Sequence, residues 1–556
     1  MPQNNSPFSY KKEQHFSQRV SFWLPLLVFG GIAMGMLIGF NLHKRTRPTL
    51  NIQSDGAIST KFFQSSKVDE VLKFINARYI EPADIQKLED AATRGILKEL
   101  DPHSNYISRE EIDSVNESLS GNFQGIGVEF YLLEDTIFIV GVIPNGPSDK
   151  AGIKVGDRII AVGDSTAIGF DSKKIMEKFK GAADTEVKVT VLRAGSNNSE
   201  DIIIKRGEIA INSVDIHYML NETTGYIKIN RFSDRTYKEF MEALEDLIEQ
   251  HKMKDLVIDL RYNGGGYLTA ATDILNQIFD TKKMLVYTEG RSYKRKEYNS
   301  TGKPFFSLGK IAVLIDEGTA SASEIMAGAI QDNDRGIIVG RRSFGKGLVQ
   351  EQYSLSDGAA IRLTVAKYYT PSGRLIQKPY ANGDEELYNQ ELKSRLENGE
   401  LSNTDSFKLA DTTKYYTQGG RIVYGGGGIM PDIFVPIDSI YINKDFVSIS
   451  AHIAPYIYKY MNTNRTNFAT YTNYESFKAA YALPNNIIAL FESYLKEKGI
   501  EYNTKAFANA KIVEKTKLNM LAYIAQQLFR DEGYYKTVHQ DDKVLKKAIE
   551  ALNDNK

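Results

Sequence analysis

The sequence predicts an α/β core that carries an inserted α+β domain, with one membrane-spanning helix before it and a helical domain after it. Three observations predict this class. Short apolar strands at 225–232 and 255–261 flank a stretch with helical spacing at 236–251, and such alternation is typical of an α/β sheet. Residues 20–42 are apolar over a length that spans a bilayer. Helical spacing rich in Tyr and Phe returns beyond residue 437.

Length and composition exclude several function classes. A chain of 556 residues predicts about two to four domains, and 42% hydrophobic with 25% charged residues is ordinary for a folded protein. A formal net charge of −1 provides no basic field for nucleic acid. The absence of Cys excludes disulfides, a thiolate nucleophile and Cys–zinc sites. No HExxH or similar ligand cluster occurs, so the sequence predicts no catalytic metal and no cofactor.

The N-terminal part divides into a polar tail at 1–19, a transmembrane anchor at 20–42 and a linker at 43–60. The apolar run carries no charge and lacks an A-x-A-like cleavage site, which favours an uncleaved anchor over a removed signal peptide. A buried core helix is the remaining alternative. Lys and Arg balance on the two sides of the run, so charge does not set its orientation.

Two regions separate the linker from the core. Residues 61–117 show helical apolar spacing and predict an N-terminal helical region. Residues 118–208 predict a small α+β domain, because a turn, a short helix and a strand follow one another at 144–164, and a closing strand alternates at 187–193. The core then occupies residues 209–436.

The stretch 311–350 carries the candidate chemistry. It reads as a strand, a tight turn, a helix that begins among the hydroxyls of 319–323, a second strand and the loop SFGKG. A hydroxyl at the start of a helix lies beside unpaired N–H groups and the positive end of the helix dipole, and both stabilise an oxyanion. No His lies in this stretch, so the nearest candidate base is Lys346, which burial would activate by lowering its pKa.

Other interpretations of these motifs remain open at this point. The Ser/Thr cluster is also a normal helix N-cap, and Gly-Lys-Gly is also a normal turn. Residues 340–347 read G-x-x-x-x-G-K-G, one residue short of a phosphate-binding loop, which needs Ser or Thr where Gly347 stands. That loop also opens a helix, whereas 348–355 reads as a strand, so a P-loop NTPase is disfavoured.

The motifs TASASEI and FGKGLVQ resemble those of the carboxy-terminal processing peptidases, also called tail-specific proteases. In that family a serine and a lysine lie 25 residues apart, as Ser321 and Lys346 do here. The resemblance implies a Ser-Lys dyad, with Gln350 orienting the lysine. It places the oxyanion donors on the N–H groups of Ala322 and of Gly265, in the turn DLRYNGGG at 259–266, where Gly264 replaces the family's proline.

Residues 118–208 resemble a PDZ domain through two motifs, GIGVEF at 125–130 and PNGPSDKAGIKVGDRIIAVGD at 144–164. In the first motif the N–H groups of Ile126, Gly127 and Val128 are expected to receive the terminal carboxylate of a peptide. The following strand edge would then accept the peptide as an added strand.

The remaining core motifs also resemble the family. Residues 359–377 match a strand pair with its turn, and 425–436 match the closing motif of the core. Residues 380–424 are polar and rich in charge, Asn and Gly, which indicates an insertion. Residues 437–556 predict a helical C-terminal domain, with a homo-oligomer or adaptor contact as an open alternative.

The resemblance therefore implies a membrane-anchored serine endopeptidase that cleaves proteins near their C-termini. It also implies a single-pass protein of the bacterial cytoplasmic membrane, with its catalytic part in the periplasm. The alternative from another class is a catalytically silent PDZ scaffold on a protease-like core.

Overall fold

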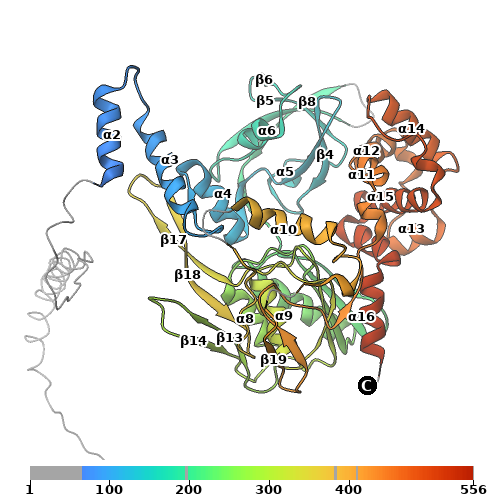
Figure 1. The fold of residues 1–556 in the computed structure, drawn as a ribbon. Helices are drawn as coiled ribbons and strands as arrows, with labels where there is room; N and C mark the ends of the chain where they lie inside the picture. Colours follow the sequence, from blue (N-terminus) through green and yellow to red (C-terminus); the bar gives the residue numbers. More distant parts are fainter. Residues whose placement is uncertain (1–65, 194–197, 381–384, 409–410, 555–556) are drawn as a thin grey trace, which may run out of the picture. The chain divides into compact units, whose positions relative to one another are not determined.

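The computed structural model describes residues 66–193, 198–380, 385–408 and 411–554 (Figure 1). It comprises two units, residues 1–85 and 86–556. In the first unit, helix α2 (Lys67–Arg78) begins after Ser66, whose hydroxyl accepts a hydrogen bond from the N–H of Asp69, as an N-cap does. The predicted anchor at 20–42 lies outside the described residues. Within the described ranges no helix combines the length and apolar character needed to cross a bilayer.

A six-stranded sheet forms the centre of the second unit. Its strand order is β10-β11-β12-β15-β16-β21, in which β10 is antiparallel to β11 and the other neighbours run parallel. The strands are β10 (Val214–Met219), β11 (Thr224–Ile229), β12 (Asp255–Asp259), β15 (Ile311–Ile315), β16 (Ile337–Gly340) and β21 (Ile433–Phe434). Strands β12 and β15 are apolar almost throughout because both of their faces are covered.

Different parts of the chain cover the two faces of this sheet. One face packs against α7 (Thr236–Glu245), α8 (Leu268–Leu275) and α9 (Ala322–Asp332). The other face packs against α16 (Lys543–Asn553), the last helix of the chain, through Val544, Leu545, Ala548 and Leu552. The C-terminal helix therefore completes the hydrophobic core around the central sheet.

A second, antiparallel sheet lies next to the core and carries part of the site. Its order is β1-β18-β13-β14, and β17 also pairs with β18. The strands are β1 (Asn105–Ile107), β13 (Met284–Glu289), β14 (Lys296–Asn299), β17 (Leu348–Ser354) and β18 (Ala360–Tyr369). Strand β17 begins directly after the SFGKG loop, so the loop connects the two sheets.

The inserted domain is built around a sheet of order β3-β4-β5-β7-β8, in which β6 also pairs with β5. Its elements are β3 (Val128–Leu133), β4 (Thr136–Val142), α5 (Pro147–Lys150), β5 (Arg158–Val162), β6 (Ser165–Thr166), α6 (Ser172–Phe179), β7 (Glu186–Leu192) and β8 (Ser199–Lys205). Helices α3 (Ile85–Lys98) and α4 (Arg109–Ser120) precede it, and strands β2 (Asn122–Gly125) and β9 (Gly207–Ala210) pair at its base. Strand β3 lies at the edge of the sheet.

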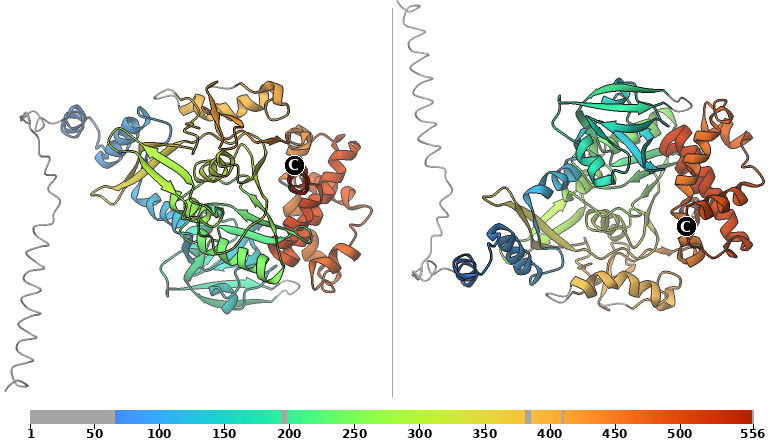
Figure 2. Two further views of the ribbon diagram at one scale, coloured as in Figure 1. Left: turned by 90° about the horizontal axis from the view of Figure 1, so that it is seen from below. Right: turned by 90° about the horizontal axis from the view of Figure 1, so that it is seen from above.

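The C-terminal region is helical and lies beside both the inserted domain and the core (Figures 1 and 2). Its helices are α11 (Lys444–Ser450), α12 (Ile453–Thr463), α13 (Tyr474–Ala480), α14 (Ile487–Glu497) and α15 (Ala510–Val538), followed by α16. Its aromatic side chains form a core of their own, as expected for amphipathic helices. The predicted α/β core, inserted α+β domain and helical C-terminal domain are confirmed.

Candidate active site

Ser321 occupies the turn between strand β15 and helix α9, at the N-cap of the helix. Its backbone has φ 56° and ψ −117°, a left-handed conformation that a serine rarely adopts. Such strain persists where the surrounding structure enforces it, and it is concentrated at functional sites. The sequence forms this turn because the buried strand β15 ends just before Asp316, which accepts hydrogen bonds from the N–H of Tyr262 and of Gly318.

The predicted catalytic and oxyanion residues line one cavity of about 510 Å³. Ser321, Ala322, Lys346, Gln350 and Gly265 all contribute to its wall. They come from the start of α9, the SFGKG loop, strand β17 and the 259–266 turn, so separate parts of the sequence meet here. The rest of the lining is mixed: it includes the polar Arg362 and Thr269 and the side chains of Tyr267, Leu268, Ile325, Leu348 and Tyr368.

Lys346 is held by Gln350, with 2.9 Å between Nζ and Oε1. In the described part of the chain, no hydrogen bond joins Nζ to the Ser321 hydroxyl; such bonds are often long before substrate binds. The Gln350 amide in turn donates to the carbonyl of His103, at 2.6 Å. Burial, followed by the positive charge of Arg362, lowers the pKa of Lys346 below its ordinary value, so its neutral form is accessible at lower pH.

Glu324 connects the serine to the lysine loop. Its buried carboxylate accepts hydrogen bonds from the N–H groups of Ser321 (2.9 Å), Lys346 (2.8 Å) and Gly345 (2.7 Å), and from the Ser343 hydroxyl (2.5 Å). Burial raises the pKa of Glu324 to about 7, while these donors act in the opposite direction. The Glu324 side chain therefore fixes the backbone at both Ser321 and Lys346.

Tyr368 joins the same two segments from strand β18. Its buried hydroxyl lies 3.1 Å from the carbonyl oxygen of Ser321 and 2.5 Å from that of Lys346. Glu324 thus holds the N–H groups of the two residues and Tyr368 holds their carbonyls. Neither contact depends on substrate.

The glycine turn lies directly against the serine. A Cβ atom on Gly265 would fall 2.7 Å from the Ser321 Cβ and 3.0 Å from the Ala322 nitrogen, and its φ of +98° also requires glycine. The Gly265 N–H donates to the side-chain oxygen of Asn263, at 2.9 Å. As an oxyanion donor it would have to exchange this acceptor for the substrate oxygen. The Ala322 N–H begins helix α9, where no acceptor lies one turn earlier.

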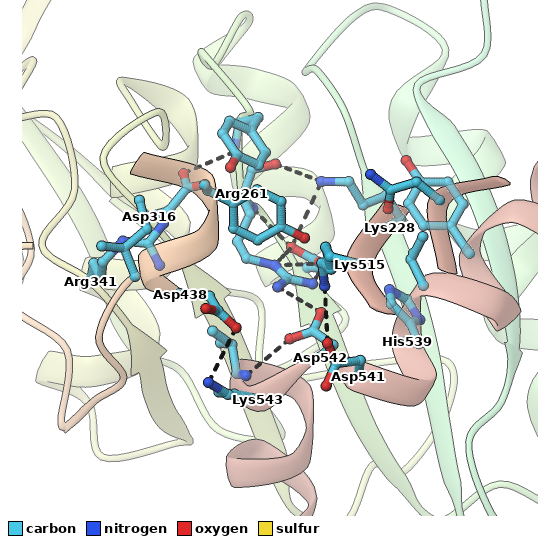
Figure 3. A pocket seen from close by; sticks show the side chains of 18 of the residues that line it. Lys228, Arg261, Asp316, Arg341, Asp438, Lys515, His539, Asp541, Asp542 and Lys543 are labelled. Atoms are coloured by element: carbon cyan, nitrogen blue, oxygen red, sulfur yellow. Dashed lines mark hydrogen bonds and ion pairs between the residues drawn. The ribbon is translucent and has the colours of Figure 1, made fainter. Parts of the chain in front are cut away.

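The charged half of the same turn lines a second cavity, of about 370 Å³, against the C-terminal helices (Figure 3). Arg261 pairs with the buried Asp259 at 2.6 Å and with Asp542, between α15 and α16, at 2.8 Å. Lys515 pairs with Asp541 in the same wall. Opposite charges thus compensate one another around this cavity, and the ion pairs tie the turn to the C-terminal domain.

The predicted peptide-binding loop lies elsewhere, between β2 and the edge strand β3. Gly127 has φ +74°, and its carbonyl accepts the N–H of Ile143. Ile126 is buried in the core of the inserted domain, and Val128 begins β3. None of these three residues lines the catalytic cavity. A peptide added to the free edge of β3 would therefore occupy a site separate from Ser321.

Sequence reasoning missed several residues that shape the site. Glu324 had a local signal, because Ser321-x-x-Glu324 is a capping-box pattern at the start of a helix. Tyr368 and Arg362 had none, since their roles depend on the position of β18 in the second sheet. Asp332 pairs with the buried Arg374, and Arg335 donates to backbone carbonyls. The described residues contain no cluster of three His, Asp or Glu suited to a metal ion.

Comparisons with known proteins show to which family the chain belongs. Residues 223–387 match Peptidase family S41, residues 124–204 match the PDZ domain, and residues 447–531 match a family of unknown function. The carboxy-terminal processing protease CtpB of Bacillus subtilis is 33% identical over 357 residues, which cover 63% of this chain and 74% of the relative. A probable CtpA-like serine protease of Staphylococcus haemolyticus is 30% identical over 420 residues, 74% of this chain and 82% of the relative.

Among solved structures, a photosystem II D1 C-terminal processing protease is 25% identical, covers 66% of this chain and 86% of its own, and has a TM-score of 0.35. The family match spans the strands and the turn that carry the site, and the relatives are aligned over most of their length. The chain therefore belongs to the carboxy-terminal processing proteases of peptidase family S41, serine peptidases that carry a PDZ domain.

Proposed function

We propose that the protein is a membrane-anchored serine endopeptidase that uses a Ser321–Lys346 dyad, with Gln350 orienting the lysine. The observation that carries this proposal is the shared cavity: the serine, the partly buried lysine and both candidate oxyanion donors face the same space. The lowered pKa of Lys346 supports its role, because a base must be uncharged before it can accept a proton.

The proposed reaction follows from these positions. Neutral Lys346 takes the proton of the Ser321 hydroxyl, and Oγ attacks the peptide carbonyl. The N–H groups of Ala322 and Gly265 bind the oxyanion, each contributing roughly 3–4 kcal/mol. Lys346 then gives its proton to the leaving amine, which departs with the C-terminal fragment. Water hydrolyses the acyl-enzyme, with Lys346 again as base.

The PDZ domain is proposed to select the substrate. A free C-terminal carboxylate would accept hydrogen bonds from the N–H groups of Ile126, Gly127 and Val128, and the tail would pair with the edge of β3. Because this loop does not line the catalytic cavity, the bound tail and the cleaved bond would belong to different stretches of the substrate.

Two substitutions test the dyad. Ser321→Ala is expected to reduce degradation of casein to background and to leave the circular dichroism spectrum unchanged; full turnover would refute the assignment. Lys346→Arg is also expected to be inactive, because arginine retains its proton. Wild-type turnover in that variant would remove Lys346 as the base. A folded, inactive wild type would instead favour the silent scaffold.

A matched pair of substrates tests tail recognition. A protein with a free C-terminus should be cleaved faster than the same protein with a C-terminal amide, because the amide carries no negative charge and has one acceptor oxygen in place of two. Equal rates would exclude carboxylate capture as a selection step.

The membrane anchor is tested by comparing the full chain with residues 43–556. The full chain should resist extraction with alkaline carbonate, and externally added protease should reach its catalytic part in spheroplasts. Equal extraction of both proteins would exclude an anchor at 20–42.

A further inference from the structure

Helix α10 (Glu385–Glu397) arises from the polar insertion and packs against the loop that carries Lys346 (Figure 1). The match to Peptidase family S41 ends at residue 387, so most of this helix lies beyond it. The loop itself, residues 342–347, has no regular secondary structure, and its carbonyl groups therefore need donors from elsewhere. Helix α10 supplies donors for two of these carbonyls, those of Ser343 and Phe344.

Arg395 provides the most direct contact. Its side chain is buried, with 3% of the residue exposed, although arginine is rarely buried without a specific partner. Nη1 donates to the Ser343 carbonyl at 2.8 Å, and Nη2 donates to the Phe344 carbonyl at 3.1 Å. The planar guanidinium thus binds two successive peptide groups just before Gly345 and Lys346, and a planar fork fixes orientation as well as distance.

Acidic residues of the insertion hold this guanidinium in place. Glu391, one turn earlier on α10, accepts the Arg395 Nε–H at 2.6 Å and lies 3.3 Å from both Arg342 and Lys378. Glu400 pairs with Arg342 at 2.5 Å. Carboxylates thus face the cations on both sides of the loop, so the buried charges of this cluster are compensated.

Tyr388 makes a second connection from the same helix. Its hydroxyl lies 2.8 Å from Nε2 of His103, and its ring meets the Phe344 ring edge-to-face. The His103 carbonyl accepts the amide of Gln350, which in turn holds the amine of Lys346. Helix α10 therefore reaches both the backbone that carries Lys346 and the side chain that orients it.

We propose that α10 is a built-in support for the catalytic base, with Arg395 and Tyr388 as positioning residues that hold Lys346 in its buried place beside Ser321. The inference rests on the proposed role of Lys346 as the base. Neither residue lines the catalytic cavity, so each acts through the loop or through Gln350 and not on the substrate.

This support has a specific consequence for pH dependence. The charged groups that face Lys346 are Arg362 on β18, Glu324 on α9 and Asp101 before β1, and His103 lies near it with a pKa lowered by burial to about 4. None of them belongs to α10. Loosening α10 therefore leaves these charges in place and changes only how far Lys346 is removed from water. A better hydrated lysine keeps its proton to higher pH.

The test measures kcat, KM and the pH dependence of kcat/KM with a peptide substrate for Arg395→Met, Arg395→Lys and Tyr388→Phe. We expect kcat to fall at least tenfold in Arg395→Met, with KM within twofold of the wild type. The acidic limb of the profile should move to higher pH. Arg395→Lys should recover part of the loss, since lysine can reach one carbonyl but not both. Tyr388→Phe should show a smaller loss and the same direction of shift.

Lys393→Met is the matched control on the same helix, because the Lys393 side chain is 74% exposed and pairs only with Glu397 among the described residues. It should match the wild type. If Arg395→Met fails to fold, the Tyr388→Phe variant tests the proposal instead. It removes only the hydroxyl oxygen and keeps the ring, so it is expected to fold. If the folded variants keep the wild-type kcat and the wild-type acidic limb of the kcat/KM profile, the proposed role of α10 is overturned.

Lys346→Met, measured in parallel, separates this inference from the proposed function. If Lys346→Met is inactive while the α10 variants equal the wild type, the support fails and the dyad stands. If Lys346→Met retains turnover, the dyad itself fails, and α10 has no catalytic base to hold.

Discussion

The two irregular segments that frame the catalytic cavity are held in different ways. The glycine half of the 259–266 turn is fixed by neutral contacts: Asn263 bonds to the Ile229 carbonyl and to the Gly265 N–H, and the Phe232 N–H donates to the Gly265 carbonyl. The 342–347 loop is fixed by ionisable side chains, with Glu324 on its N–H groups and Arg395 on its carbonyls. The contacts that hold the proposed oxyanion donor Gly265 thus involve no titratable group, whereas those that hold the proposed base do.

This difference suits the two chemical tasks. An oxyanion site works best when its dipoles are already in place, because their reorganisation would cost free energy during the reaction. A base must instead keep its pKa near the working pH, and nearby charges set that value. Substitutions in the turn should therefore act mainly by misplacing atoms, and substitutions near the loop should act by shifting titrations.

The largest effect is expected for Gly265→Ala, on the turn. Its Cβ would meet the Ser321 Cβ and the Ala320 carbonyl at 2.7 Å, so the backbone must move away from the serine. We expect kcat/KM to fall by about 1,000-fold, consistent with loss of an oxyanion donor. The loss should be the same at every pH. A loss that disappears at high pH would place this glycine on the side of the base.

The next effect is expected for Glu324→Gln, on the loop. In the wild type, four N–H or O–H donors bond to the two carboxylate oxygens of Glu324. The glutamine amide has only one acceptor oxygen, so at least one of these buried donors loses its partner. An unsatisfied buried group costs about 1–3 kcal/mol, and we expect roughly 100-fold lower kcat.

The pH profile of the same variant provides a second measurement. Burial raises the pKa of Glu324 to about 7, so wild-type activity should fall as Glu324 takes up a proton below that pH. Glutamine does not titrate, and this step should be absent from its profile. A step near pH 7 that persists in Glu324→Gln would belong to another group.

Arg362→Gln should have a smaller effect, confined to the base. Burial and then the charge of Arg362 lower the pKa of Lys346, so removing that charge should raise it. The neutral fraction of Lys346 then falls at pH values below its pKa. Activity near pH 7 should fall and should recover as the pH rises. A loss independent of pH would indicate that Arg362 contacts substrate.

Asp542→Asn should have the smallest effect on turnover. It removes the ion pair to Arg261 but leaves Asp259, which bonds to the same guanidinium. We expect about 1–3 kcal/mol lower stability in thermal unfolding, as for a hydrogen bond to a charged group, and kcat within twofold for the folded enzyme. A tenfold loss of kcat would show that the C-terminal domain, and not Asn263, holds the turn.

The sequence predicted the parts of the molecule that local pattern determines. Apolar runs predicted strands β12 and β15, and the resemblance to the carboxy-terminal processing peptidases selected Ser321, Lys346 and Gln350, which line one cavity. The glycine-rich turn indicated a close backbone approach, which Gly265 makes to Ser321. The assignment of catalytic roles to these residues stays a prediction.

Contacts between segments that are distant in the sequence could not be predicted from the sequence alone. Helix α16 reads as part of a separate helical domain, yet it covers one face of the core sheet. Arg395 and Tyr388 read as surface positions in a polar insertion, yet both are buried against the lysine loop. The Gly265 N–H was expected to be free for substrate, whereas Asn263, two residues earlier, accepts it. Such pairings depend on tertiary structure that periodicity does not encode.

The most direct test labels the serine itself. A serine-directed fluorophosphonate is added to the wild type and to Lys346→Met, and intact-mass and peptide mass spectrometry follow the adduct over time from pH 6 to 10. The account predicts an adduct on Ser321 in the wild type, formed faster as the pH rises, and almost none in Lys346→Met. Labelling of another residue by an active enzyme, or equal rates in both proteins, would contradict it.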